Sequence, residues 1–231
     1  MKKILLIISI LTCFNFVAKS QNLPMADIRP YHFGFMLGIN AMDFGIKPSM
    51  IEIDGKVYKA DVTTLIPGLS VGVIGDVRLG EYFNVRLIPA LHLGERTLSY
   101  VNDKNSEVFK QNLKTYLLTV PVYFKYSAVR IKNYRPYLIA GGGVAFDLGR
   151  DRQYPLLLKQ FDYFIDFGVG CTFYFPFFRF SPELKFAMGF NNILTPLAER
   201  PKDYVSSDQI FVTNALSRLT SRMFTLVFNF E

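Results

Sequence analysis

The sequence predicts an all-β protein, an eight-stranded antiparallel transmembrane β-barrel of the outer-membrane type. Three observations predict this fold. Eight runs of roughly ten residues alternate apolar and non-apolar side chains, as strands do between lipid and a lumen. The connections between these runs alternate in length, mostly long and then short. The chain also begins with a leader typical of exported proteins.

The leader is expected to be a signal peptide over residues 1–20. Two lysines precede a largely apolar stretch over residues 4–17, and small residues follow at the positions that a signal peptidase requires. Cleavage is therefore expected between Ser20 and Gln21. Lipidation at Cys13 is the alternative, and the threonine before it is a poor residue for that modification.

The mature chain is expected to comprise a periplasmic lead-in over residues 21–30 and the barrel over residues 31–231. No stretch in it approaches the ~20 apolar residues of a membrane helix. The net charge of +7 falls to +4 without the three leader lysines, which is too weak to argue for an anionic partner. Cys171 is then the only cysteine, which excludes an internal disulfide, and its phase places it on the lipid face.

The first four strands are predicted within residues 32–40, 65–78, 83–93 and 116–126. In each run, side chains two positions apart share one face, and that face is apolar. Their predicted lipid faces carry Phe33, Phe35, Leu37 and Ile39; Leu65, Leu69, Val71 and Val73; Phe83, Val85, Leu87, Leu91 and Leu93; and Tyr116, Leu118, Val120, Val122, Phe124 and Tyr126.

The last four strands are predicted within residues 137–148, 161–175, 178–190 and 223–230. The glycine-rich run over 137–148 shows no clear alternation, so its two faces stay unassigned. The run over 161–175 is the most regular, with an apolar residue at every odd position. Three runs contain a proline, which cannot donate to a strand ladder and is expected to mark a bulge: Pro89, Pro121 and Pro182.

The connections predict the topology. Those after the first, third, fifth and seventh runs are long, and outer-membrane barrels place long loops outside and short turns in the periplasm. The sequence therefore predicts four long extracellular loops: 41–64, 94–114, 149–159 and 191–222. The short turns are 80–81 and 176–177, and the connection over 127–135 is intermediate. The last loop is apolar enough either to pack across the mouth or to contact a partner, through Leu194, Pro196, Leu197, Pro201, Tyr204 and Val205.

A soluble sandwich or lipocalin-like barrel is the alternative fold. Its apolar face would lie inside, and its outer face would carry many lysines and glutamates. Here the non-apolar face holds mainly glycine, serine, threonine and asparagine, which suits a narrow lumen better than a solvated surface.

The scattered charges on that face predict a lumenal network. An eight-stranded barrel has an interior that side chains fill, and buried charges there should pair. Pairing around the short turns puts Asp76 opposite Arg86, and Asp166 opposite Ala187 and diagonal to Lys185. The proposed network comprises Asp76, Arg86, Lys125, Asp162, Asp166, Arg179, Glu183 and Lys185. A solute pathway lined by these charges is the alternative.

The sequence predicts no catalytic, cofactor or metal site. His32 and His92 lie on strands that place them near opposite membrane faces, too far apart to share a metal. A lipid-hydrolase triad around His92 stays open, although nothing resembles a nucleophile elbow. The loop residues that could complete it are Ser99, Ser106, Glu95 and Glu107.

Two stretches resemble known families. Residues 28–40 (IRPYHFGFMLGIN), followed by Met42-Asp43-Phe44, resemble the amino-terminal signature of the PorT family of Bacteroidota, called SprT in gliding species. Residues 117–126 (LLTVPVYFKY) and 135–138 (RPYL) resemble the middle of the wider outer-membrane β-barrel family of that phylum. The likeness spans essentially the whole mature chain.

The PorT resemblance implies a Gram-negative outer-membrane protein required for type IX secretion, which exports cargo with a carboxy-terminal signal domain, including gliding adhesins. Its implied partners are outer-membrane lipid and other components of that machinery, without nucleic acid or a small-molecule substrate. The family brings no catalytic residues. A general anchoring or adhesive barrel is the alternative function, and a lipid-modifying enzyme is a third class.

Overall fold

The computed structural model describes residues 22, 23, 25–49, 52, 53, 56, 57, 59–101, 107–149, 156–196 and 213–231. The predicted signal peptide, residues 1–20, and its cleavage site before Gln21 lie outside these residues. No helix among the described residues is long and apolar enough to cross a membrane.

The strands form one closed antiparallel sheet, apart from a small separate hairpin made of β2 and β3. They are β1 Tyr31–Pro48, β2 Glu52–Ile53, β3 Lys56–Val57, β4 Lys59–Leu65, β5 Pro67–Arg78, β6 Phe83–Leu87, β7 Ala90–Val101, β8 Glu107–Ser127, β9 Tyr134–Asp147, β10 Phe161–Tyr174, β11 Arg179–Gly189 and β12 Leu216–Phe230.

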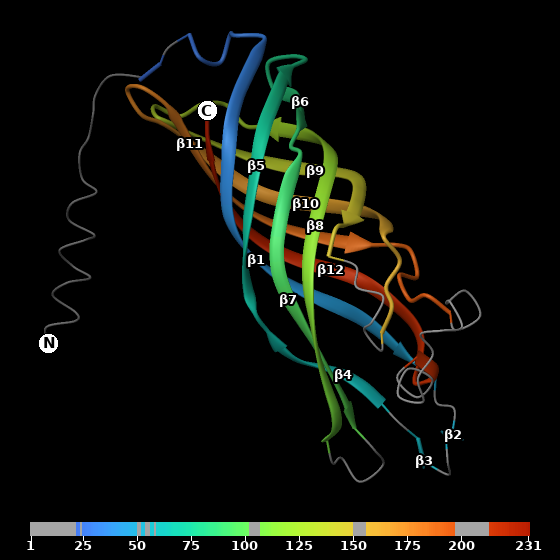
Figure 1. The fold of residues 1–231 in the computed structure, drawn as a ribbon. Helices are drawn as coiled ribbons and strands as arrows, with labels where there is room; N and C mark the ends of the chain where they lie inside the picture. The colour runs from blue at the N-terminus through green and yellow to red at the C-terminus, as the bar shows by residue number, and fades with distance from the viewer. Residues whose placement is uncertain are drawn as a thin grey trace, which may run out of the picture.

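Eight strand positions close the ring, which confirms the predicted fold (Figure 1). Strands β6 and β7 share one position between β5 and β8, and β1 closes the barrel by pairing with both β12 and β5. Strand β4 extends beyond the ring and pairs with β7. We call the end with the β5–β6, β8–β9 and β10–β11 connections the turn end, and the opposite end the hairpin end.

The strand faces are as the alternation predicts. Predicted lipid-facing side chains such as Phe33, Leu69 and Phe124 are exposed, and their neighbours Ser70 and Tyr123 are buried in the lumen. The structure also assigns the faces of the glycine-rich fifth run, now β9. Its lumenal side chains include Tyr137, Ile139 and Ala145, while Leu138 points outward.

The third run is not one continuous strand. It breaks between β6 and β7 at residues 88–89, because Pro89 has no N–H to donate to the ladder. The carbonyl of Pro89 still accepts a 3.1 Å hydrogen bond from the Val73 N–H, which keeps the two pieces in register with β5. Pro121 and Pro182 lie within β8 and β11, opposite Gly143 and Phe228, in ladders without a register shift, so the bulges predicted at these two prolines are wrong.

Three of the four predicted long loops are strand over part of their length, so their predicted bounds are wrong. Strand β1 continues to Pro48, and the β7–β8 ladder runs on to the Val101–Glu107 pair. Strand β12 begins at Leu216, six residues before the predicted loop end. Beyond a membrane the outer face of a strand meets water, so the apolar alternation stops while the backbone ladder continues.

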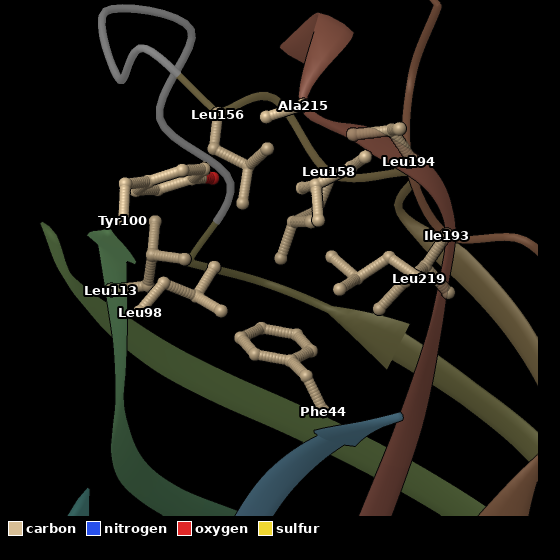
Figure 2. Packing of buried hydrophobic residues seen from close by; sticks show 11 residues of the cluster. Phe44, Leu98, Tyr100, Leu113, Leu156, Leu158, Ile193, Leu194, Ala215 and Leu219 are labelled. Atoms are coloured by element: carbon tan, nitrogen blue, oxygen red, sulfur yellow. The ribbon is translucent and has the colours of Figure 1, made fainter. Parts of the chain in front are cut away.

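Apolar side chains fill the hairpin end. Four strands and two connections contribute to one buried cluster, whose side chains point toward one another (Figure 2). Its members are Phe44, Leu98, Tyr100, Leu113, Leu156, Leu158, Ile193, Leu194, Ala215, Leu216 and Leu219. The last loop thus packs across the mouth at Leu194, which bridges to Leu158, whereas Pro196 is exposed. Its other predicted apolar residues, Leu197, Pro201, Tyr204 and Val205, lie outside the described residues.

Candidate functional site

The candidate site is an ion-pair network in the lumen, centred on the fully buried Arg86 of β6. Its Nε donates to Asp76 Oδ2 at 2.8 Å, Nη1 to Glu183 Oε1 at 2.7 Å and Nη2 to Glu231 Oε1 at 2.5 Å. The register that places Asp76 opposite Arg86 is the predicted one. Glu231 also accepts from Arg179, so Arg86 and Arg179 are tied together through one carboxylate.

A tyrosine laid across a glycine braces this network. Tyr137 of β9, Gly170 of β10 and Glu183 of β11 are successive cross-strand partners. The Tyr137 hydroxyl donates to Glu183 Oε1 at 2.5 Å, over the top of the glycine. A Cβ on Gly170 would lie 2.6 Å from Cζ and Oη of the tyrosine. Glycine therefore clears the space that the ring occupies.

The same arrangement recurs one strand earlier in the ring. Tyr123 of β8, Gly141 of β9 and Asp166 of β10 are also successive partners. The Tyr123 hydroxyl lies 2.5 Å from Asp166 Oδ2, and a Cβ on Gly141 would lie 2.8 Å from the tyrosine Cδ1. Two rows of tyrosine, glycine and carboxylate thus cross the lumen on adjacent strands.

The predicted contact between Asp166 and Lys185 is not formed, although Asp166 does face Ala187. Lys185 Nζ lies 3.5 Å from the Tyr123 hydroxyl and 3.9 Å from Glu183 Oε2. Asp166 Oδ2 is bound by the same hydroxyl. The Tyr123 hydroxyl, whose ring lies across Gly141, contacts both charges and links them through its oxygen.

The other two predicted network members differ in their surroundings. Lys125 is buried with its ammonium 4.0 Å from the centre of the Tyr137 ring, a cation–π contact that joins it to the network. Asp162 is also buried but lies toward the hairpin end, where its Oδ1 accepts from the Asn191 N–H at 3.2 Å. It forms no ion pair among the described residues and is therefore not part of the network.

The histidines do not build a reactive centre in the described part of the chain. The His92 ring is buried in the lumen, with Nδ1 2.7 Å from Ser70 Oγ and Nε2 3.1 Å from Thr119 Oγ1. Both ring nitrogens of His92 thus contact hydroxyl groups of neighbouring strands, and neither contacts a described serine of the following loop. Of the loop residues considered for a triad, Ser106 and the side chain of Glu107 lie outside the described residues. No cluster of metal-ligating side chains occurs in the part of the chain that the structure describes.

The segment before β1 covers the turn end. We call residues 22, 23 and 25–30 the lead segment. Its Asp27 carboxylate is bound by Arg130 Nη1 at 3.1 Å, Arg135 Nη1 at 3.3 Å and the Tyr174 hydroxyl at 2.5 Å. Burial by itself raises the pKa of Asp27, but these three donors outweigh it and hold the pKa below its usual 3.8.

The side chains leave little free volume between the two covered ends. Three cavities lined by described lumenal residues measure about 10 to 20 Å³. A cavity of that size holds about one water molecule and no solute. The lumen is therefore closed by the apolar cluster, the ion-pair network and the lead segment in series. Sequence reasoning missed Tyr137, Glu231 and Asp27. Tyr137 reaches Glu183 across the intervening β10, Glu231 reaches Arg86 across the lumen, and Asp27 lies before the first strand, so pairing around the short turns brings none of these contacts to light.

The family that the sequence matches agrees with this architecture. The family described as "Outer membrane protein beta-barrel domain" matches residues 19–195 of the sequence. Among solved structures, the outer membrane protein OprG from Pseudomonas aeruginosa is similar, with a TM-score of 0.47 and 11% sequence identity. That alignment covers 91% of this chain and 94% of OprG. No curated protein matches the sequence.

Proposed function

Because the chain belongs to the outer membrane protein β-barrel domain family, and so lies in the outer membrane of a Gram-negative cell, we propose that it is a non-enzymatic support barrel of the type IX secretion machinery. The resemblance of residues 28–44 to the PorT signature points to this machinery. The observation that carries the support role is the closed lumen, which holds ion pairs where a conduit would hold water.

Residues of the PorT-like signature contribute to both covered ends. Asp43 and Phe44 lie near the hairpin end, and Phe44 enters the apolar cluster. At the start of the signature, the Ile28 carbonyl accepts from Arg78 Nη1 at 3.3 Å, which helps to hold the lead segment over the turn end. A barrel closed in this way acts on its partners through its outer surface and its two ends.

The test is export in a deletion strain. Removing the gene is expected to leave cargo with carboxy-terminal signal domains in the periplasm, and to abolish spreading in a gliding species. Immunoblots of periplasmic and surface fractions measure the first effect. Normal export without the gene would refute the type IX assignment and favour a general anchoring barrel.

A conservative lumenal variant separates support from conduction. Met223→Leu keeps the volume of a buried lumenal side chain and should leave the barrel inserted, with export near normal. Loss of export in a correctly inserted Met223→Leu barrel would favour a conduit over a support role.

A further inference from the structure

A cavity of about 490 Å³ lies at the turn end and has no assigned role. It lies between the lead segment, the start of β1 and the β10–β11 turn, and its volume falls in the range of ligand pockets, roughly 300–1,000 Å³. Figure 1 shows the lead segment arching from the barrel rim above this region. Unlike the lumenal cavities, it could hold a small molecule.

The cavity opens at an edge of the barrel that faces lipid. Strand β1 pairs with β12 only from Phe35 onward, so Tyr31, His32 and Phe33 lack a partner on that side. Phe33 is 77% exposed, and Phe177 of the β10–β11 turn is 93% exposed. Both aromatic side chains line the cavity. Aromatic rings at this level are typical of the girdle where a barrel meets the lipid headgroups.

One end of the cavity is cationic. Arg29 of the lead segment is exposed and has no ion pair or hydrogen bond with any described residue. Arg179 lines the cavity as well, together with Glu231. The Glu231 carboxylate is buried and already bound by Arg86 and Arg179, so it does not neutralise Arg29.

The remaining wall is apolar, with Leu23, Met25 and Ala26 of the lead segment. An apolar wall beside a free guanidinium, at the level of an interfacial girdle, matches an acyl chain attached to a phosphodiester. Guanidinium groups bind phosphate through charge-assisted hydrogen bonds. We propose that this cavity binds one anionic phospholipid from the membrane leaflet at the turn end. The proposal requires only a membrane-embedded barrel and is independent of the secretion role.

Native mass spectrometry of the purified barrel in detergent tests the proposal. The wild-type protein, titrated with phosphatidylglycerol, should bind one lipid, and should bind phosphatidylcholine of the same chain length about tenfold more weakly. Arg29→Gln should lower the phosphatidylglycerol affinity by about tenfold, the usual scale for one charge-assisted contact. Lys132→Gln is the matched control, because Lys132 is an exposed cation at the same end that does not line the cavity.

Two further arms identify the part of the lipid that is bound. Met25→Asn, on the surface of the lead segment, should weaken binding through the apolar wall without loss of the folded barrel. Inorganic phosphate and glycerophosphoglycerol should fail to displace the lipid at millimolar concentration. Displacement by either would show a headgroup site only and overturn the proposal.

Equal affinity of Arg29→Gln and wild type for phosphatidylglycerol would overturn it as well. So would displacement of the lipid by an extended peptide that adds to the free edge of β1, because the edge would then be a peptide site.

Discussion

Replacing Gly170 by alanine tests whether the tyrosine that crosses it closes the lumen. The added Cβ would meet Cζ and Oη of Tyr137 at 2.6 Å, closer than such atoms are found in proteins. Either the ring stays and the contact is strained, or the ring moves and its hydroxyl loses Glu183 Oε1, now 2.5 Å away. Both responses act on the ion-pair network around Arg86, because Glu183 is one of its three carboxylates.

The two responses set the size of the effect. Forcing an extra methyl group into a packed interior costs about 1–3 kcal/mol. Losing a buried hydrogen bond to a charged group costs about 1.5–3 kcal/mol. The protein takes the less costly route, so we expect Gly170→Ala to lower the free energy of unfolding by about 1–3 kcal/mol.

Reversible urea unfolding in detergent or in lipid vesicles, followed by far-ultraviolet circular dichroism and by gel migration, measures this loss of stability. Neither readout needs a tryptophan, which the chain lacks. Gly75→Ala is the matched control, since Gly75 is also a strand glycine and a Cβ there would meet nothing within 4 Å. Adding Tyr137→Ala should make Gly170→Ala nearly neutral, because the clash then has no partner. Equal stability of the Gly170→Ala and Gly75→Ala barrels would refute the argument.

Three other outcomes follow from the described contacts. Arg86→Met leaves three buried carboxylates without their common partner and should lower the free energy of unfolding by at least about 3–5 kcal/mol in the same urea assay. Arg86→Lys should recover part of this loss, and a wild-type unfolding midpoint for Arg86→Met would contradict the network. Because the pKa of Asp27 is lowered in the folded state, its contacts should stabilise the lead segment above pH 3.8 and lose this effect as the pH falls through the lower, folded-state value. Hydrogen exchange of the lead segment, corrected for its intrinsic pH dependence, should show this loss in wild type and none in Asp27→Asn. In a Cys171→Ala background, cysteine at the hairpin-end Lys110 should label from outside intact cells and cysteine at the turn-end Lys132 should not; the reverse pattern would invert the topology.

The strand faces could be predicted because two solvents select them. Lipid demands an apolar residue at every second position, and that demand is visible at Phe161–Tyr174 without any structure. The pairing of Asp76 with Arg86 was also predictable, because a short turn fixes the register of the strands that it joins. The faces of the glycine-rich β9 could not be predicted in the same way, since glycine carries no side chain that shows which face meets lipid.

The rest of the site depends on contacts between side chains of strands that are not neighbours, and the register of neighbouring strands does not predict such contacts. Tyr137 reaches Glu183 two strands away, which requires a glycine at Gly170 between them. The contact between Asp166 and Lys185 was expected from adjacent strands, and it is displaced by Tyr123 from a third. A side chain that crosses a neighbouring strand leaves no periodic signal in the sequence.

The closed lumen limits how this barrel can serve a secretion machine. Passing a solute through the turn-end half would require Arg86 to release its carboxylates. Each released carboxylate would then be a buried charge without compensation, at a cost of several kcal/mol. Opening the hairpin end would require the cluster around Phe44 to separate into water. Both ends would have to open together for transport. The energy that closes the lumen therefore favours the proposed support role, in which the rigid barrel presents its lipid-facing girdle and its turn end to other components.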